Sequence, residues 1–216
     1  MCIQTSAYPV MMIHFLLSLL LTVSFRSDTN DSIYLPIQTS DRQSLNDVPL
    51  TPIGQFGILR DARPHVPAHY HTGIDIMRPH TNYKDEPIFP VARGVVMSKR
   101  DDGPYAQLIL EHNLKQLTFW TLYEHISGIT AEVGEPVYPH LPVARFMNES
   151  ELNTYGWQFD HFHFEILKTE PLKVEYDPSK PDRYFGSYTL MCYTEADLNT
   201  YFYNPIEFFE YFWQKR

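Results

Sequence analysis

Short apolar or alternating runs, separated by turn residues, dominate the chain from residue 55 onward. Alternation with a period of two residues is typical of half-buried strands, and turn residues between such runs favour antiparallel hairpins. Asp101-Asp102-Gly103-Pro104 is predicted to be one hairpin turn. The predicted strands occupy residues 55–59, 73–76, 88–98, 107–111, 117–125, 137–147 and 161–167. The pattern predicts a mostly β fold, an antiparallel β-sheet or sandwich.

A short helix is predicted to close this domain at the C-terminus. Residues 206–214 follow Asn204-Pro205 and are rich in apolar and aromatic side chains. We expect this aromatic stripe to pack against the domain rather than to bind a ligand.

Two histidine motifs about ninety residues apart carry the clearest chemical signal: His71-Thr72-Gly73-Ile74-Asp75 and His161-Phe162-His163-Phe164-Glu165. Histidine and carboxylate are the groups that hold a catalytic zinc ion through three protein ligands. One H-x-H motif alone is weak evidence, because histidine commonly makes ordinary hydrogen bonds. His69-Tyr70-His71 forms a second such motif, and His65 lies nearby, so the residues alone leave the ligand set open.

Strand alternation relates these histidines to one another. Side chains two residues apart share a strand face, so His161 and His163 point the same way and Phe162 points the opposite way. His125 ends a predicted strand and is placed where it could face the same cleft. His71 and Asp75 need a bend between them, because four residues of straight strand span about 13 Å, and Gly73 permits one.

Four segments resemble, in order, those of the lysostaphin/LytM-type zinc metallopeptidases, which are peptidoglycan endopeptidases. They are His71–Asp75 with the following Glu86–Val96, then Leu122-Tyr123-Glu124-His125-Ile126-Ser127, Val133-Gly134-Glu135-Pro136-Val137, and His161-Phe162-His163-Phe164-Glu165-Ile166. The resemblance covers residues 55 to 168.

The resemblance implies a role for each matching residue. His71, Asp75 and His163 would bind Zn²⁺, while His125 and His161 would be the two catalytic histidines. Glu165 is interpreted as a group that supports the site without binding the ion. The implied activity is zinc-dependent hydrolysis of peptide bonds, in cross-bridges or stem peptides of peptidoglycan.

Two other functional classes stay open. Some members of this fold are non-catalytic and regulate other cell-wall hydrolases, and in a third interpretation the histidines are incidental to a structural β domain. Two segments also depart from the family pattern. Residues 148–160 replace a loop rich in glycine and serine and are expected to form a wall of the substrate groove. The tyrosine-rich residues 168–203 are expected to pack, or else to form a lid.

The N-terminal region predicts export. The first 25 residues contain no Asp, Glu, Lys or Arg, and residues 10–23 are nearly all apolar. This run is shorter than a spanning helix needs, so residues 1–25 are interpreted as an export signal or, if uncleaved, an N-terminal membrane anchor. Residues 26–50 are predicted to be a linker, and residues 51–216 the metallopeptidase domain. The expected location is periplasmic or extracellular, at the cell envelope.

The net charge of −9 excludes one class of partner. Binding to nucleic acid depends on basic patches that neutralise phosphates, and this chain is acidic. We therefore expect a peptide substrate and no nucleic-acid partner.

Overall fold

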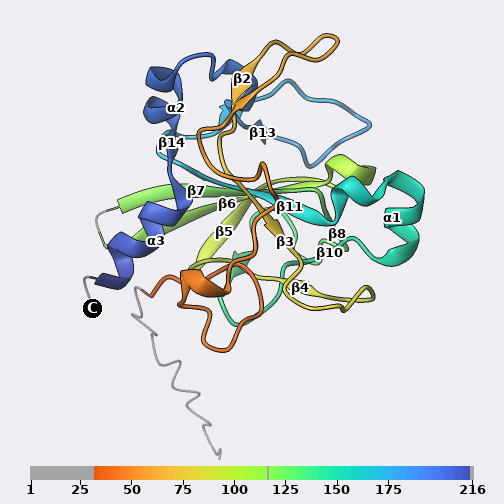
Figure 1. Ribbon diagram of the computed structural model, residues 1–216, viewed down its shortest axis with the longest axis vertical. Helices are drawn as coiled ribbons and strands as arrows, with labels where there is room; N and C mark the ends of the chain where they lie inside the picture. The colour runs from red at the N-terminus through yellow and green to blue at the C-terminus, as the bar shows by residue number, and fades with distance from the viewer. Residues whose placement is uncertain (1–31, 116, 215–216) are drawn as a thin grey trace, which may run out of the picture. The chain divides into compact units, whose positions relative to one another are not determined.

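A seven-stranded antiparallel sheet forms the centre of the computed structural model, which describes residues 32–115 and 117–214 (Figure 1). Its hydrogen-bonded order is β14 (Phe202–Tyr203), β11 (His161–Leu167), β7 (Leu117–Glu124), β6 (Gln107–Leu114), β5 (Gly94–Arg100) and β9 (Pro136–Val137). β3 (Ile74–Met77) also pairs with β11. The prediction of a mostly β, antiparallel fold is confirmed.

Three smaller sheets surround the central one. They pair β4 (Pro87–Ile88) and β8 (Ile126–Ser127) with β10 (Ala144–Phe146), β1 (Leu59–Arg60) with β2 (His69–Tyr70), and β12 (Leu172–Lys173) with β13 (Phe185–Gly186). Two predicted strands are therefore divided, 88–98 into β4 and β5, and 137–147 into β9 and β10. Prolines explain the divisions, because Pro90, Pro139 and Pro142 lack the backbone N–H that a continuous ladder requires. Of the run 55–59, only Leu59 joins a strand.

The two faces of the central sheet cover two separate hydrophobic cores. On β11, Phe162, Phe164 and Ile166 lie in the larger core, whereas Leu167 lies in the smaller one. By alternation His163 is directed to the side of the smaller core. The phenylalanines thus anchor the strand on one face while the histidine side remains available for chemistry.

Three helices flank the sheet: α1 (Glu149–Tyr155), α2 (Glu195–Tyr201) and α3 (Pro205–Gln214). α3 confirms the predicted closing helix, and its Phe208 and Phe209 lie in the larger core. α1 and α2 were not predicted, because seven residues are too few to show a helical period. Each begins with a capping box, formed by Asn148 with Glu151 and by Thr194 with Asp197.

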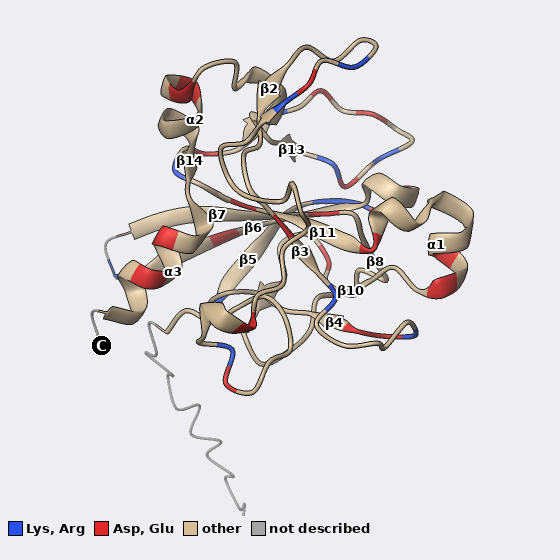
Figure 2. Cartoon of the chain, in the orientation of Figure 1, with Lys and Arg blue, Asp and Glu red and all other residues tan. Residues whose placement is uncertain are grey.

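Four short 3₁₀ helices complete the described elements: η1 (Leu45–Asp47), η2 (Gly103–Tyr105), η3 (Trp157–Phe159) and η4 (Thr189–Met191). η2 lies in the predicted turn between β5 and β6. Every charged residue of α1, α2 and α3 within the described part of the chain is acidic (Figure 2). None of the helices described is long and apolar enough to cross a membrane.

Residues 32–50 differ from the predicted linker, since they pack as part of the domain. Ile33, Leu35 and Ile37 are at most 1% exposed and belong to the larger core. Ile37 also bridges to Ile88 of β4. Among the described residues, the compact unit accordingly includes those from Ser32 onward and not only those from residue 51. The period-two pattern of these three apolar residues was present in the sequence but was too short to stand out among its polar neighbours.

Arg42 holds this segment in place. Its guanidinium donates hydrogen bonds to the carbonyl oxygens of Leu35, Pro90 and Pro139, and it lies 4.2 Å from the centre of the Phe89 ring. These contacts join the segment to the loops that follow β4 and β9. The proposed export signal or anchor, residues 1–25, lies outside the described residues.

Leu35→Ala should lower the free energy of unfolding by about 2–5 kcal/mol, the usual cost of a cavity in a packed core. Gln38→Ala, three residues away on an exposed side chain, should change it by less than about 0.5 kcal/mol. Denaturant unfolding of both variants measures the difference. Equal stabilities would mean that residues 32–50 are a linker after all.

Candidate metal centre

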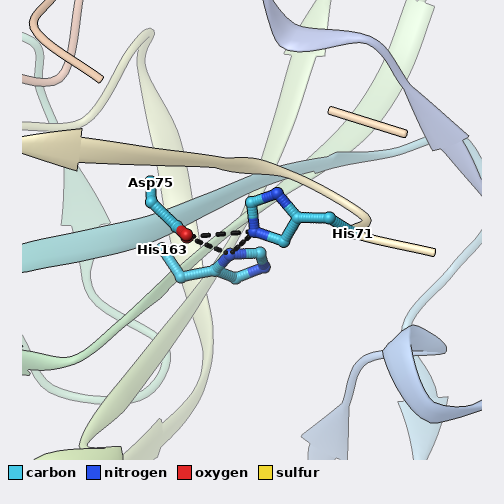
Figure 3. Close-up of side chains that lie close together, drawn as sticks. All are labelled: His71, Asp75 and His163. Atoms are coloured by element: carbon cyan, nitrogen blue, oxygen red, sulfur yellow. Dashed lines mark hydrogen bonds and ion pairs between the residues drawn. The ribbon is translucent and has the colours of Figure 1, made fainter. Parts of the chain in front are cut away.

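Three buried side chains converge beside β11. His71 Nε2, His163 Nδ1 and Asp75 Oδ1 lie 2.9 to 3.0 Å from one another (Figure 3). His71 follows β2, Asp75 lies on β3 and His163 lies on β11. The antiparallel register pairs His163 directly with Asp75, so the pairing of two strands brings two of these residues together.

Gly73 brings β3 against β11, and it does so by its small size. A Cβ atom built on Gly73 would lie 2.2 Å from the carbonyl oxygen of Phe164. The sequence suggested instead that Gly73 permits a bend, yet its φ is not in the left-handed region. The glycine is required because only a hydrogen fits between the two backbones.

The outer nitrogen of each histidine faces an oxygen that can only accept a hydrogen bond. His71 Nδ1 lies 2.8 Å from the carbonyl oxygen of Gln55, and His163 Nε2 lies 2.9 Å from Glu165 Oε1. These contacts place the protons on the outer nitrogens, so in the neutral rings the inner nitrogens direct lone pairs toward Asp75.

This donor set fits a zinc ion. Two imidazole nitrogens and one carboxylate oxygen form one of the usual sets of three protein ligands in catalytic zinc sites. Tetrahedral bonds of about 2.0–2.1 Å would separate the ligand atoms by about 3.3 Å. The side chains would therefore have to spread by only a few tenths of an ångström. A cation would also relieve the crowding of three acceptor atoms.

The electrostatics of the centre also favour a cation. Burial alone would lower the pKa of His163, but hydrogen bonds with Asp75 and Glu165 outweigh it and raise the pKa to about 10. For Asp75, burial opposes ionisation, but hydrogen bonds from His163 and His71 hold its pKa below the usual range. The negative charges of Asp75 and Glu165 that raise this pKa would also attract a cation, and a bound metal ion would take the place of the proton on His163.

Arg60 fixes the second oxygen of Asp75. Its guanidinium lies 2.8 Å from Asp75 Oδ2, whereas Oδ1 faces the two histidines. Asp75 would therefore bind an ion through one oxygen. Arg60 was not singled out from the sequence, because its partner lies fifteen residues further along the chain and belongs to another small strand.

His161 and His125 adjoin the three converging side chains. His161 Nε2 lies 4.0 Å from Asp75 Oδ1, and its ring centre lies 5.5 Å from that of His125. The structure therefore brings all five predicted site residues together. His69 lies apart, with its Nδ1 2.8 Å from the carbonyl oxygen of Pro67.

His125 reaches the site by a backbone turn. Strict alternation from Tyr123, which lies in the larger core, would direct His125 into that core as well. The strand instead ends at Glu124, and His125 has a φ of 63°. Left-handed backbone is uncommon for a residue other than glycine, and it accumulates at functional sites.

The surroundings of His125 and His161 keep both imidazoles neutral. Burial lowers the pKa of each to about 4. His125 Nδ1 donates a hydrogen bond to the carbonyl oxygen of Pro104 at 2.6 Å, which leaves its Nε2 as the acceptor. The rings of Tyr105 and Phe159 pack against His125 at 5.7 and 5.0 Å between centres.

Residues 148–160, the expected groove wall, form α1 and η3. Phe159 contacts His125, while Tyr155 and Trp157 are exposed. Arg78 binds both ends of this segment, since its guanidinium donates to the Met147 carbonyl at 2.6 Å and to Asp160 at 3.0 Å. Its role was not predictable, because both partners are about seventy or more residues away.

Residues 168–203 supply packing, one of the two roles considered for them. Cys192, Leu198 and Phe202 are buried in the smaller core. Ser187 and Thr189 donate hydrogen bonds to Glu165, the neighbour of His163. No pattern in the sequence indicated these two contacts.

Replacing His71, Asp75 or His163 with alanine should in each case abolish metal binding, because two ligands hold zinc far more weakly than three. His69→Ala should keep the metal, since its ring lies outside the group. Elemental analysis of the purified variants measures zinc per chain. Full occupancy in any of the three would remove that residue from the ligand set, and loss in His69→Ala alone would shift the assigned motif by two residues.

Comparison with known proteins identifies the family. The model of peptidase family M23 matches residues 69–178, half of the chain. No curated protein matches the sequence. Several solved structures are similar. One is a zinc-containing peptidase from Vibrio cholerae, with 21% identity over 62% of this chain and 36% of that chain, and a TM-score of 0.43.

Another is a mutant of the catalytic domain of the prophage-encoded M23 protein EnpA from Enterococcus faecalis. Its identity is 20% over 66% of this chain and 95% of that chain, and its TM-score is 0.36. This chain spans about a third of the Vibrio protein and nearly all of the EnpA domain. The family match contains all five site residues, and the chain belongs to peptidase family M23.

Proposed function

We propose that this protein is a zinc-dependent endopeptidase that is exported and hydrolyses peptide bonds in the cross-bridges or stem peptides of peptidoglycan. One observation carries the proposal. The inner nitrogens of His71 and His163 and one oxygen of Asp75 converge within 3.0 Å, and partners on the far side of each imidazole orient it. Membership of a peptidase family supports the interpretation of this arrangement as the metal site of a peptidase.

His71, Asp75 and His163 would hold the zinc ion. When bound, zinc supplies a Lewis acid for the scissile carbonyl and lowers the pKa of water toward about 7. The other steps fall to the histidines beside the centre.

His125 and His161 are suited to move protons. Both are neutral at pH 7, because burial holds each pKa near 4. The Nε2 of His125 has a free lone pair, since Nδ1 donates to Pro104. One imidazole can accept the proton of the attacking water and then donate the same proton to the leaving amine as the bond breaks, while the other can donate a hydrogen bond to the developing oxyanion.

The substrate class and location rest on the resemblance to peptidoglycan endopeptidases. An apolar segment at residues 10–23 supports export, and peptidoglycan lies outside the cytoplasm. The exposed aromatic rings of Tyr155 and Trp157 offer a surface against which a peptide or sugar could pack. Membrane attachment would follow only if the N-terminal segment stays uncleaved.

His125→Ala and His161→Ala should each retain zinc and slow hydrolysis by about 10² or more, the scale of a positioned proton-transfer or oxyanion group. His125→Gly is the matched control for backbone strain, because glycine adopts a φ of 63° freely. Zinc content and turnover are measured on the same samples. Wild-type turnover with zinc retained would exclude both histidines from catalysis.

Digestion of purified peptidoglycan tests the function itself. We expect the intact protein to release soluble fragments whose masses identify the broken bond, and His163→Ala to release none. A protein that binds zinc stoichiometrically but releases no fragment would instead be a non-catalytic regulator. A protein that binds no zinc would leave the histidines with a structural role.

A further inference from the structure

A buried carboxylate orients His163 from the side opposite Asp75. Glu165 is 0% exposed, and its Oε1 lies 2.9 Å from His163 Nε2. Burying a carboxylate without hydrogen-bond partners is very costly, so the groups that surround it are part of the site.

Three hydroxyl groups, which we call the hydroxyl cage, surround Glu165. Thr72 and Thr189 donate to Oε1 at 2.5 and 2.6 Å, and Ser187 donates to Oε2 at 2.6 Å. With the N–H of His163, the carboxylate has four donors. Each hydroxyl has a single proton, and all three protons can point to Glu165, which is the arrangement that an ionised carboxylate requires.

Two of the three cage residues lie outside the family domain. The M23 match ends at residue 178, whereas Ser187 and Thr189 lie at 187 and 189, between β13 and α2. Cys192, which follows closely, is buried in the smaller core and holds this stretch against the sheet. The segment after the family domain therefore reaches back to the support of a candidate metal ligand.

The consequence for His163 is a fixed tautomer. An ionised Glu165 accepts the proton of Nε2, so that Nδ1 presents its lone pair to the centre. If the carboxylate rotated away from Nε2, the imidazole could carry its proton on Nδ1, where it would block a metal ion. The cage opposes this rotation, because its hydroxyl groups bind both oxygens of Glu165.

We propose that Ser187 and Thr189 are positioning residues that set the metal affinity of the centre by holding Glu165 against His163. The proposal rests on the proposed zinc site. Supporting hydrogen bonds of this kind typically change metal affinity by about 10- to 100-fold. The segment would thus act as a clamp on the site and not as a lid over the substrate groove.

Zinc affinity, measured by competition with a chromophoric chelator, tests the clamp. Ser187→Ala with Thr189→Val should weaken zinc binding by about 10- to 100-fold, whereas Ser187→Ala with Thr189→Ser should recover most of the loss. Glu165→Gln, which keeps the volume, should weaken binding to a similar degree. Ser179→Ala is the control, because its exposed hydroxyl donates to Asp177, away from the centre.

The possible outcomes distinguish a failure of the clamp proposal from a failure of the proposed function. Folding of each variant is checked by near-ultraviolet circular dichroism before titration. If the wild type binds zinc and the double variant binds it equally well, the clamp is overturned and the peptidase proposal stands. Weaker binding that Thr189→Ser does not rescue also overturns the clamp. A wild type without zinc affinity overturns both proposals.

Discussion

The pairing of β11 with β3 is the constraint on which the rest of the site depends. It places His163 directly opposite Asp75, and it is possible only because Gly73 lets the two backbones approach. Strand side chains alternate, so a slip of one residue would turn the histidines into the core and the phenylalanines toward the site. Register is thus specified by packing: Phe162 and Phe164, both fully buried, oppose that slip.

The two faces of β11 have different roles: one packs in the larger core, and the other carries the candidate site residues. The larger core on one face is apolar and rich in phenylalanine, and it fixes the position of the strand by packing. On the other face, the two buried carboxylates of the site have partners, Arg60 for Asp75 and the hydroxyl cage for Glu165. Buried charges that are paired and hydrogen-bonded have fixed positions and orientations, and a metal site needs ligands that are held in this way.

Much of this arrangement was visible in the sequence, because it depends on local periodicity. Alternation predicted β11 to the residue and placed His161 and His163 on one face. The helices α1 and α2 could have been found from their capping boxes. His125 lay beyond such reasoning, since its left-handed φ reverses the direction that alternation assigns. The packing of residues 32–50 also depends on distant partners, above all on the contacts of Arg42.

Four residues that support the predicted site residues lie outside the family match, and none of them was predicted. Gln55 and Arg60 precede residue 69, and they orient His71 and Asp75. Ser187 and Thr189 follow residue 178, and they hold the carboxylate behind His163. The ligand motif specifies which atoms meet an ion, but its surroundings determine how firmly those atoms are held. A chain of this family can therefore keep the motif and change its metal affinity through residues that the motif does not contain.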